Sequence, residues 1–171
     1  MGPTALSRRK LLASAGLGVG VLALAGCSDR VDGAPADDAT SPAGSADLEL
    51  ARRVARRVGA LLDALAGAAK EHRELRAILR PLQARHREHV GAFTPDGETL
   101  RFPGLFGVPR TAEATLAALV RSERGAAVAI GNAALIARSG ELAGALASAA
   151  ASMAQHVVLL EAARDDERGG S

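Results

Sequence analysis

An apolar residue recurs every three or four positions through about the last 125 residues, and this spacing restricts the fold more than any other feature. Alternating steps of three and four place the apolar side chains along one face of an α-helix, which another element must cover. Ala, Leu, Arg and Glu, which favour helices, dominate this region. We therefore predict an all-α domain. The first apolar stripe consists of Leu50, Val54, Val58, Leu61 and Leu65.

Breaks in this pattern divide the domain, residues 47–171, into four predicted helices. The loop at residues 91–110, which contains GAFTPDGETLRFPGLFGVP, is rich in Gly and Pro and predicts a long connection. Short joins elsewhere favour antiparallel pairs, so the expected fold is a four-helix bundle of two helical hairpins joined by a long crossover loop. An up-down-up-down bundle is the alternative. We expect the helices at residues 47–69, 71–90, 112–138 and 141–164, the third capped by Thr111.

Residues 1–26 are typical of an export signal. Arg8, Arg9 and Lys10 form a cationic cluster, and the apolar stretch that follows is shorter than the ~20 residues of a membrane-spanning helix. The letters SRRKLL resemble the twin-arginine export motif, and LAGC, which ends at Cys27, resembles the lipobox of bacterial lipoproteins. We predict a twin-arginine lipoprotein signal peptide whose cleavage leaves a lipid on Cys27. An ordinary signal peptide with an incidental cysteine is the alternative.

Residues 27–46 are rich in Asp, Pro, Gly, Ser and Ala, with almost nothing to bury, so we expect a disordered tether. With the lipid on Cys27, this tether would hold the domain at the outer face of the cytoplasmic membrane. Without the three signal-peptide cations the chain has 18 basic and 19 acidic residues, and it has no Trp or Tyr. This composition shows no pattern for binding nucleic acid. The sequence identifies no protein partner.

Polar side chains interrupt three of the apolar stripes. Glu123 lies on the otherwise aliphatic stripe of the third helix, and His156 lies on that of the fourth. Such groups are costly to bury without partners, and both are ligands for Zn, Cu and Fe. We predict one polar centre, formed by His86, His89, Glu123 and His156, with one transition-metal ion as its candidate cofactor. The second stripe reads His72, Leu75, Leu79, Leu82, His86, His89 and Phe93, of which His72 is expected to be exposed.

Three segments of the domain, LRPLQARHREHV, AALVRSERGAA and LASAAASMAQHVVLL, resemble the ferritin-like domains of exported, alanine-rich lipoproteins of actinobacteria. The resemblance covers residues 48–163, which is nearly the whole domain. It implies a ferritin-like fold and a candidate site more than a reaction, because that family has no settled activity.

The candidate ligands depart from those of the di-iron ferritins, which use a Glu from each of two helices and Glu-x-x-His from each of the other two. Here the second helix offers His86-x-x-His89 and the fourth offers Met153-x-x-His156. The first helix supplies no inward glutamate, since Asp63 lies off its stripe. We therefore do not expect a carboxylate-bridged di-iron oxidase centre.

Three hypotheses about function remain open at this point. The polar centre could bind a single metal ion, or it could be a hydrogen-bonded network left from a metal site and kept because removing one partner strands the others. The protein could instead be a structural or partner-binding lipoprotein that uses the loop at residues 91–110. The three phenylalanines in or beside that loop are expected to pin it to the end of the bundle: Phe93, Phe102 and Phe106.

The sequence argues against hydrolytic catalysis. It contains neither a nucleophile elbow nor an HExxH motif, and Cys27 is its one cysteine. Ser152 precedes His156 by one helical turn, but a hydroxyl on a helix more often bonds its own backbone. We assign no catalytic residue on the basis of the sequence.

Overall fold

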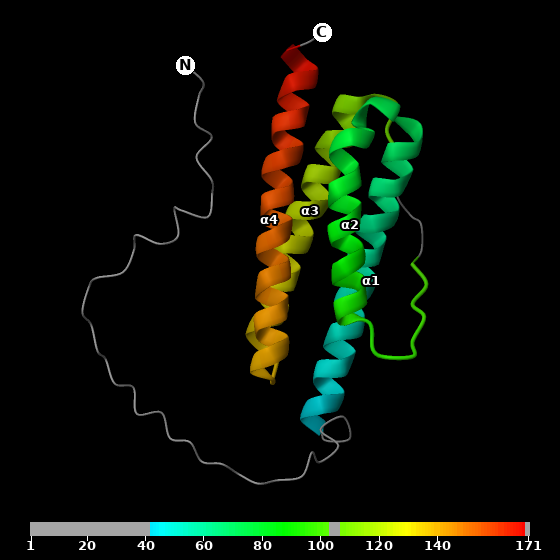
Figure 1. Cartoon of the computed structure of the whole chain (residues 1–171). Helices are drawn as coiled ribbons and strands as arrows, with labels where there is room; N and C mark the ends of the chain where they lie inside the picture. The colour runs from blue at the N-terminus through cyan, green and yellow to red at the C-terminus, as the bar shows by residue number, and fades with distance from the viewer. Residues whose placement is uncertain (1–41, 103–106, 170–171) are drawn as a thin grey trace, which may run out of the picture. The chain divides into compact units, whose positions relative to one another are not determined.

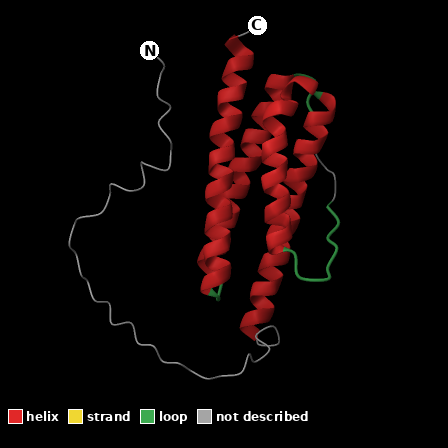
Figure 2. Ribbon diagram, in the orientation of Figure 1, coloured by secondary structure: helices red, strands yellow, loops and turns green. Residues whose placement is uncertain are grey.

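The computed structural model describes residues 42–102 and 107–169, and all regular structure within these residues is helical. The all-α class predicted from the sequence is thus confirmed. The predicted signal peptide, Cys27 and the tether as far as residue 41 lie outside the described residues. Figures 1 and 2 show the four long helices packed side by side, and we call them the bundle. They are α1 (Pro42–Glu71), α2 (Arg76–Phe93), α3 (Ala112–Ile136) and α4 (Gly140–Gly169), with a short 3-10 helix, η3 (Arg73–Leu75), before α2.

The helices form two antiparallel hairpins, α1 with α2 and α3 with α4, and the packing within each hairpin is much closer than the packing between them. Side-chain caps mark the residues at which α3 and α4 begin. Thr111 caps α3 as predicted, because its Oγ1 accepts a hydrogen bond of 3.2 Å from the N–H of Ala114. Ser139 Oγ accepts from the N–H of Leu142 in the same way at the start of α4.

The two hairpins are joined by a crossover connection, and α2 and α3 run in the same direction (Figure 1). Thr115 lies at the start of α3, and its Oγ1 is 3.0 Å from Nε2 of His72, the residue that precedes η3 and α2. At the opposite end of the bundle, Asp47 of α1 accepts hydrogen bonds from the N–H groups of Arg138 and Ser139, between α3 and α4. This arrangement excludes the up-down-up-down alternative. The connection has to travel the length of α2, about 27 Å.

Two glycines of α1 make room for this connection. A Cβ atom placed on Gly59 would collide with the ring of Phe102, and one on Gly67 would lie 3.3 Å from Val108. Phe102 therefore packs against the side of α1, and not at the end of the bundle as expected, while Phe106 lies outside the described residues. The part of the loop that follows α2 is also bound to α1 by a charged hydrogen bond, in which Arg52 Nε donates to Glu98 Oε1 at 2.8 Å.

The bundle interior contains two apolar clusters with polar residues between them. Along α4, Met153 belongs to one cluster and Val157 to the other, and the buried His156 lies between them in the chain. Glu123 separates the same two clusters on α3, where the flanking buried residues are Val120 and Ala126. The predicted polar positions thus form a layer within an otherwise apolar core.

The outer helices end at different residues from those expected. α1 begins at Pro42 rather than residue 47, so the last residues assigned to the tether belong to this helix. Proline is well tolerated in the first turn of a helix, because its missing N–H would be unpaired there. α4 continues to Gly169, and its last turn is tied to the start of α3 by an ion pair of 2.6 Å between Arg168 and Glu113.

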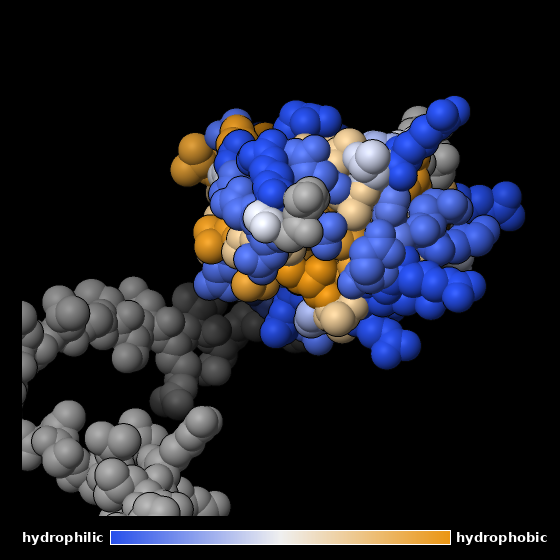
Figure 3. Space-filling model, turned by 90° about the horizontal axis from the view of Figure 1, so that it is seen from above, coloured by the Kyte–Doolittle hydropathy of each residue, from blue (hydrophilic) through white to orange (hydrophobic). Residues whose placement is uncertain are grey.

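Among the described helices, α4 alone is long and apolar enough to span a membrane, by length and composition only. Its outer face exposes Val158 and Leu159. Figure 3 shows apolar groups along the side of the molecule where Figure 1 places α4. Core helices of soluble proteins pass the same test, and α4 packs closely on α3 and turns His156 inward. The feature is therefore weak support for contact with a membrane.

Candidate metal centre

Three of the four predicted site residues meet in the polar layer of the bundle. His86, Glu123 and His156 come from α2, α3 and α4, and each lies near the middle of its helix. The apolar stripes explain this meeting, since each residue occupies a position that faces the shared core. The side chains of His86 and Glu123 are fully buried, and that of His156 is nearly so.

Glu123 Oε1 is the centre of this group. It lies 2.6 Å from His86 Nε2, which is a short hydrogen bond, and 3.6 Å from His156 Nδ1. The rings of His86 and His156 contact each other edge to face, with centroids 5.0 Å apart. One donor atom from each of the three residues lies within 4.8 Å of the other two. The arrangement therefore presents two imidazoles and a carboxylate to one point.

The carboxyl group of Glu123 is stabilised in its charged form. Burial acts to raise its pKa, but the imidazoles of His156 and His86 outweigh this effect, so the pKa lies below its usual value. A buried carboxylate in this state needs positive or hydrogen-bonding partners. The two imidazoles are the partners that the described residues provide.

His89 lies beside the centre but does not join the closest group of donor atoms. Its ring is 6.5 Å from that of His86, and its Nε2 is buried without a hydrogen-bond partner. Burial lowers the pKa of His89, and the neighbouring His86 and His156 lower it further. His89 is therefore held in its neutral form, which is the form that binds metals.

Several polar atoms of the centre have no hydrogen-bond partner among the described residues. They are His86 Nδ1, His89 Nε2, Glu123 Oε2 and His156 Nδ1. Buried polar atoms are nearly always paired in proteins, so a group of four unpaired atoms needs an explanation. A bound ion or ordered water molecules would supply the partners that are lacking.

His72 has a different role from the other histidines, and the expectation that it is exposed was wrong. It is 7% exposed, and its Nε2 lies 3.0 Å from both Pro109 O and Thr115 Oγ1. The crossover loop returns to the bundle here and covers the ring, which the sequence of the helix alone did not reveal. His72 thus anchors the loop and lies apart from the polar centre.

The structure buries two further polar residues that the stripes did not identify. Gln83 lies one turn before His86, and its amide donates to Leu65 O at 3.1 Å. Thr115 is fully buried, and its hydroxyl donates to Pro109 O. The spacing of Gln83 from His86 was a signal that could have been read, because residues three apart share a helix face. The half-buried Asp63 of α1 is not in the group of potential ligands.

No protein-family model, curated protein or solved structure matches this chain. The geometry of the bundle and of its polar centre therefore carries the functional argument.

Proposed function

We propose that this protein binds one transition-metal ion in the interior of the bundle, through His86, Glu123 and His156, with His89 as the fourth ligand. The observation that carries the proposal is the convergence of three buried donor atoms within 4.8 Å of one another. The polar atoms left unpaired around them add to it.

The spacing of the donor atoms suits a single ion after a small adjustment. Two ligands at ~2.1 Å from one tetrahedral ion are about 3.4 Å apart. His156 Nδ1 and Glu123 Oε1 are 3.6 Å apart, close to this value. His86 Nε2 and Glu123 Oε1 are closer, at 2.6 Å, because a proton lies between them. An ion that replaced this proton would move the two groups apart by less than ~1 Å.

The ligand set favours zinc, copper or iron over magnesium and calcium. Imidazole nitrogen is a good ligand for the first three metals, whereas magnesium and calcium prefer sites made entirely of oxygen. With three protein ligands the ion would keep an open position, as in catalytic zinc sites; with His89 bound it would be closed. We assign no reaction to the centre.

The proposal extends to the architecture and the location of the protein. We infer a ferritin-like domain, because two helical hairpins joined by one long crossover connection are found in such folds. We also infer export by the twin-arginine route and anchoring through a lipid on Cys27. Both inferences about location rest on SRRKLL and LAGC in the sequence.

A second candidate is that the centre is a structural network, the remnant of a metal site in a structural or partner-binding lipoprotein. The hydrogen bond of 2.6 Å between His86 and Glu123 favours it, because this bond already pairs one oxygen of the buried carboxylate without an ion. In that case the protein would be equally stable with and without chelator.

Metal content distinguishes the two candidates. The protein would be purified without affinity tags or chelators, and its metals would be counted per chain by plasma mass spectrometry, before and after separate addition of Zn, Cu and Fe. We expect near-stoichiometric binding of one of these metals. The double variant His86→Ala, His89→Ala should lose it, because two imidazoles are removed.

A matched control separates loss of ligands from loss of folding. Glu123→Gln keeps the shape of the side chain but removes the anionic ligand, so metal affinity should fall while the circular dichroism spectrum stays helical. His72→Ala removes a buried histidine outside the centre and should leave the metal content unchanged. Equal metal content in the wild type and the double variant would contradict the proposal, as would no binding of any of the three metals.

A further inference from the structure

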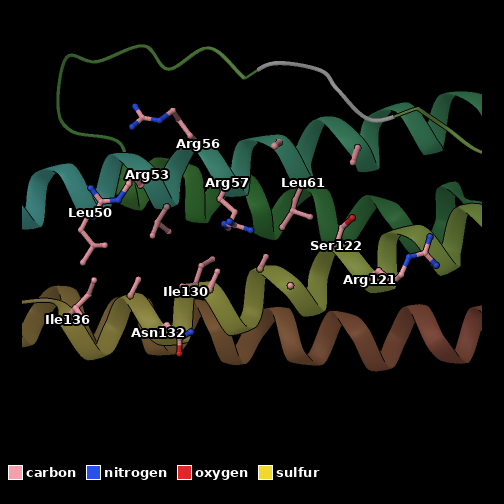
Figure 4. Close-up of a pocket in the computed structure, with 17 residues that line it drawn as sticks. Leu50, Arg53, Arg56, Arg57, Leu61, Arg121, Ser122, Ile130, Asn132 and Ile136 are labelled. Carbon is pink, nitrogen blue, oxygen red and sulfur yellow. The ribbon is translucent and has the colours of Figure 1, made fainter.

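A groove of about 1000 Å³ runs between α1 and α3, where the two hairpins meet less closely than the helices within each hairpin. Figure 4 shows it along the two helices, with Leu50 and Ile136 at one end and Arg121 and Ser122 towards the other. None of the four residues of the metal centre lines it. The groove is therefore a separate feature of the molecule.

The floor of the groove is apolar. Leu61 and Ile130 point into the gap from opposite helices (Figure 4). Much of the remaining lining consists of small residues, whose side chains project little from the surface. These small residues are Ala60, Ala64, Gly125, Ala126, Ala129 and Ala133.

The rim of the groove carries positive charge. Among the described residues, four arginines line it, and no Asp or Glu does. Arg57 points from α1 into the gap towards α3, whereas Arg56 points away, towards the loop (Figure 4). Arg56 also contributes to lowering the pKa of Glu98, so it already has an acidic neighbour. Among the described residues, Arg53, Arg57 and Arg121 have no ion-pair partner.

We propose that this groove binds a long-chain fatty carboxylate. The lining runs from Leu50 to Ala64 on α1, which corresponds to about 21 Å of helix. An acyl chain that spans half of a bilayer's hydrocarbon core covers ~15 Å, so it fits lengthwise on the apolar floor. Arg53 and Arg57 are one turn apart on α1, and their guanidinium groups match the geometry of a carboxylate.

The shape of the floor favours an acyl chain over a protein helix. Helices pack by inserting side-chain ridges into grooves between larger side chains, whereas the alanines and Gly125 in this lining form few such ridges and grooves. An unbranched hydrocarbon chain needs no such pockets. The described lining contains arginines but no acidic residue that would repel an anion. The charged end of the ligand is therefore an anion.

Binding would be measured with cis-parinaric acid, a long-chain fatty acid that fluoresces in apolar surroundings, and with palmitate as the competitor. We expect saturable binding at one site per chain and displacement by palmitate. Hexadecanol has the same chain without the charge, and octanoate has the charge on a short chain. Both should compete at least about tenfold more weakly, because each lacks one of the two interactions.

Two pairs of variants connect the binding to this groove. Arg53→Gln with Arg57→Gln should weaken palmitate at least about tenfold. Arg73→Gln with Arg80→Gln removes two exposed arginines outside the groove and should have no effect. The second pair introduces tryptophan, which the chain lacks. Ala60→Trp fills the groove, and the fluorescence of the new tryptophan reports on it. Ala84→Trp, on the exposed side of α2, is its control.

The outcomes separate this ligand from other occupants. No saturable binding of parinaric acid would overturn the proposal, and so would equal weakening by both arginine pairs. Hexadecanol competing as well as palmitate would show nonspecific apolar binding and would also overturn it. Attachment to anionic phospholipid vesicles through Arg53 and Arg57, without uptake of free palmitate, would replace it with a membrane-docking surface.

Discussion

Glu123 is the residue on which the polar layer depends, because both imidazoles face its carboxylate. Deletion of this carboxylate leaves the fully buried His86 without its hydrogen-bond acceptor and removes the negative charge beside His156. We expect Glu123→Ala to lower the free energy of unfolding by about 3–5 kcal/mol in metal-free protein, as is typical when one partner of a buried pair is removed. Urea denaturation followed by circular dichroism measures this change.

Glu161→Ala is the control for this prediction, since Glu161 pairs with Arg124 at the surface. A solvent-exposed pair contributes less than about 1 kcal/mol, so this variant should be close to wild type. If the two glutamate variants have the same stability, the carboxylate of Glu123 does not organise the core.

The histidines show how far residue-level reasoning from the sequence could go. The steps of three and four correctly turned His86 and His156 inward, because the apolar neighbours on the same stripe fix the buried face. The same reasoning could not show that His89 lies outside the tightest group, since the crossing of the helices decides this. It also missed the burial of His72, which comes from the returning loop.

At the scale of the helix, α1 is shaped by the loop that lies against it. Gly59 is buried under the ring of Phe102, and any side chain there would collide with that ring. Gly59→Ala should therefore destabilise the protein by about 1–3 kcal/mol, although alanine favours helices more than glycine does. Thermal unfolding measures the change.

Gly144→Ala on α4 is the matched substitution. No atom of the described part of the chain lies within 4 Å of a Cβ atom at Gly144, so the same replacement should stabilise the helix by about 0.5–1 kcal/mol. Opposite signs for the two variants are the expected result. A stabilising effect of Gly59→Ala would show that Phe102 does not occupy the described position.

Asp47 ties the start of α1 to the join between α3 and α4. The N–H groups of Arg138 and Ser139 lower its pKa, so the folded state holds its carboxylate charged more readily than the unfolded state does. This contribution is present above the ordinary pKa near 3.8 and is lost as the pH falls through the lower value of the folded protein. Asp47→Ala should lower the melting temperature at pH 7, and the difference from wild type should shrink below about pH 4.

Asp166→Ala serves as the control for this measurement, because Asp166 is exposed near the end of α4. Its substitution should leave the melting temperature nearly unchanged at every pH. A constant difference between Asp47→Ala and wild type from pH 7 to pH 3 would mean that the charge of Asp47 does not stabilise the fold.

At the scale of the whole molecule, the number and order of the helices followed from apolar spacing and from the Gly- and Pro-rich loop. The length of this loop favoured α2 and α3 running in the same direction, since a short turn would force them to be antiparallel. It left the up-down-up-down alternative open, because a long loop can also join antiparallel helices. The groove between α1 and α3 could not be foreseen, because it depends on how closely the hairpins approach. Its arginines look like an ordinary solvated helix face in the sequence.

The crossover also determines when the polar centre forms during folding. Each hairpin contains contacts between residues near in sequence, and such contacts form early. His86 belongs to the first hairpin, whereas Glu123 and His156 belong to the second. The three side chains therefore meet only when the hairpins dock. Under the proposed metal-binding function, capture of the ion would be a late event, and a bound ion would report a completed assembly of the two halves.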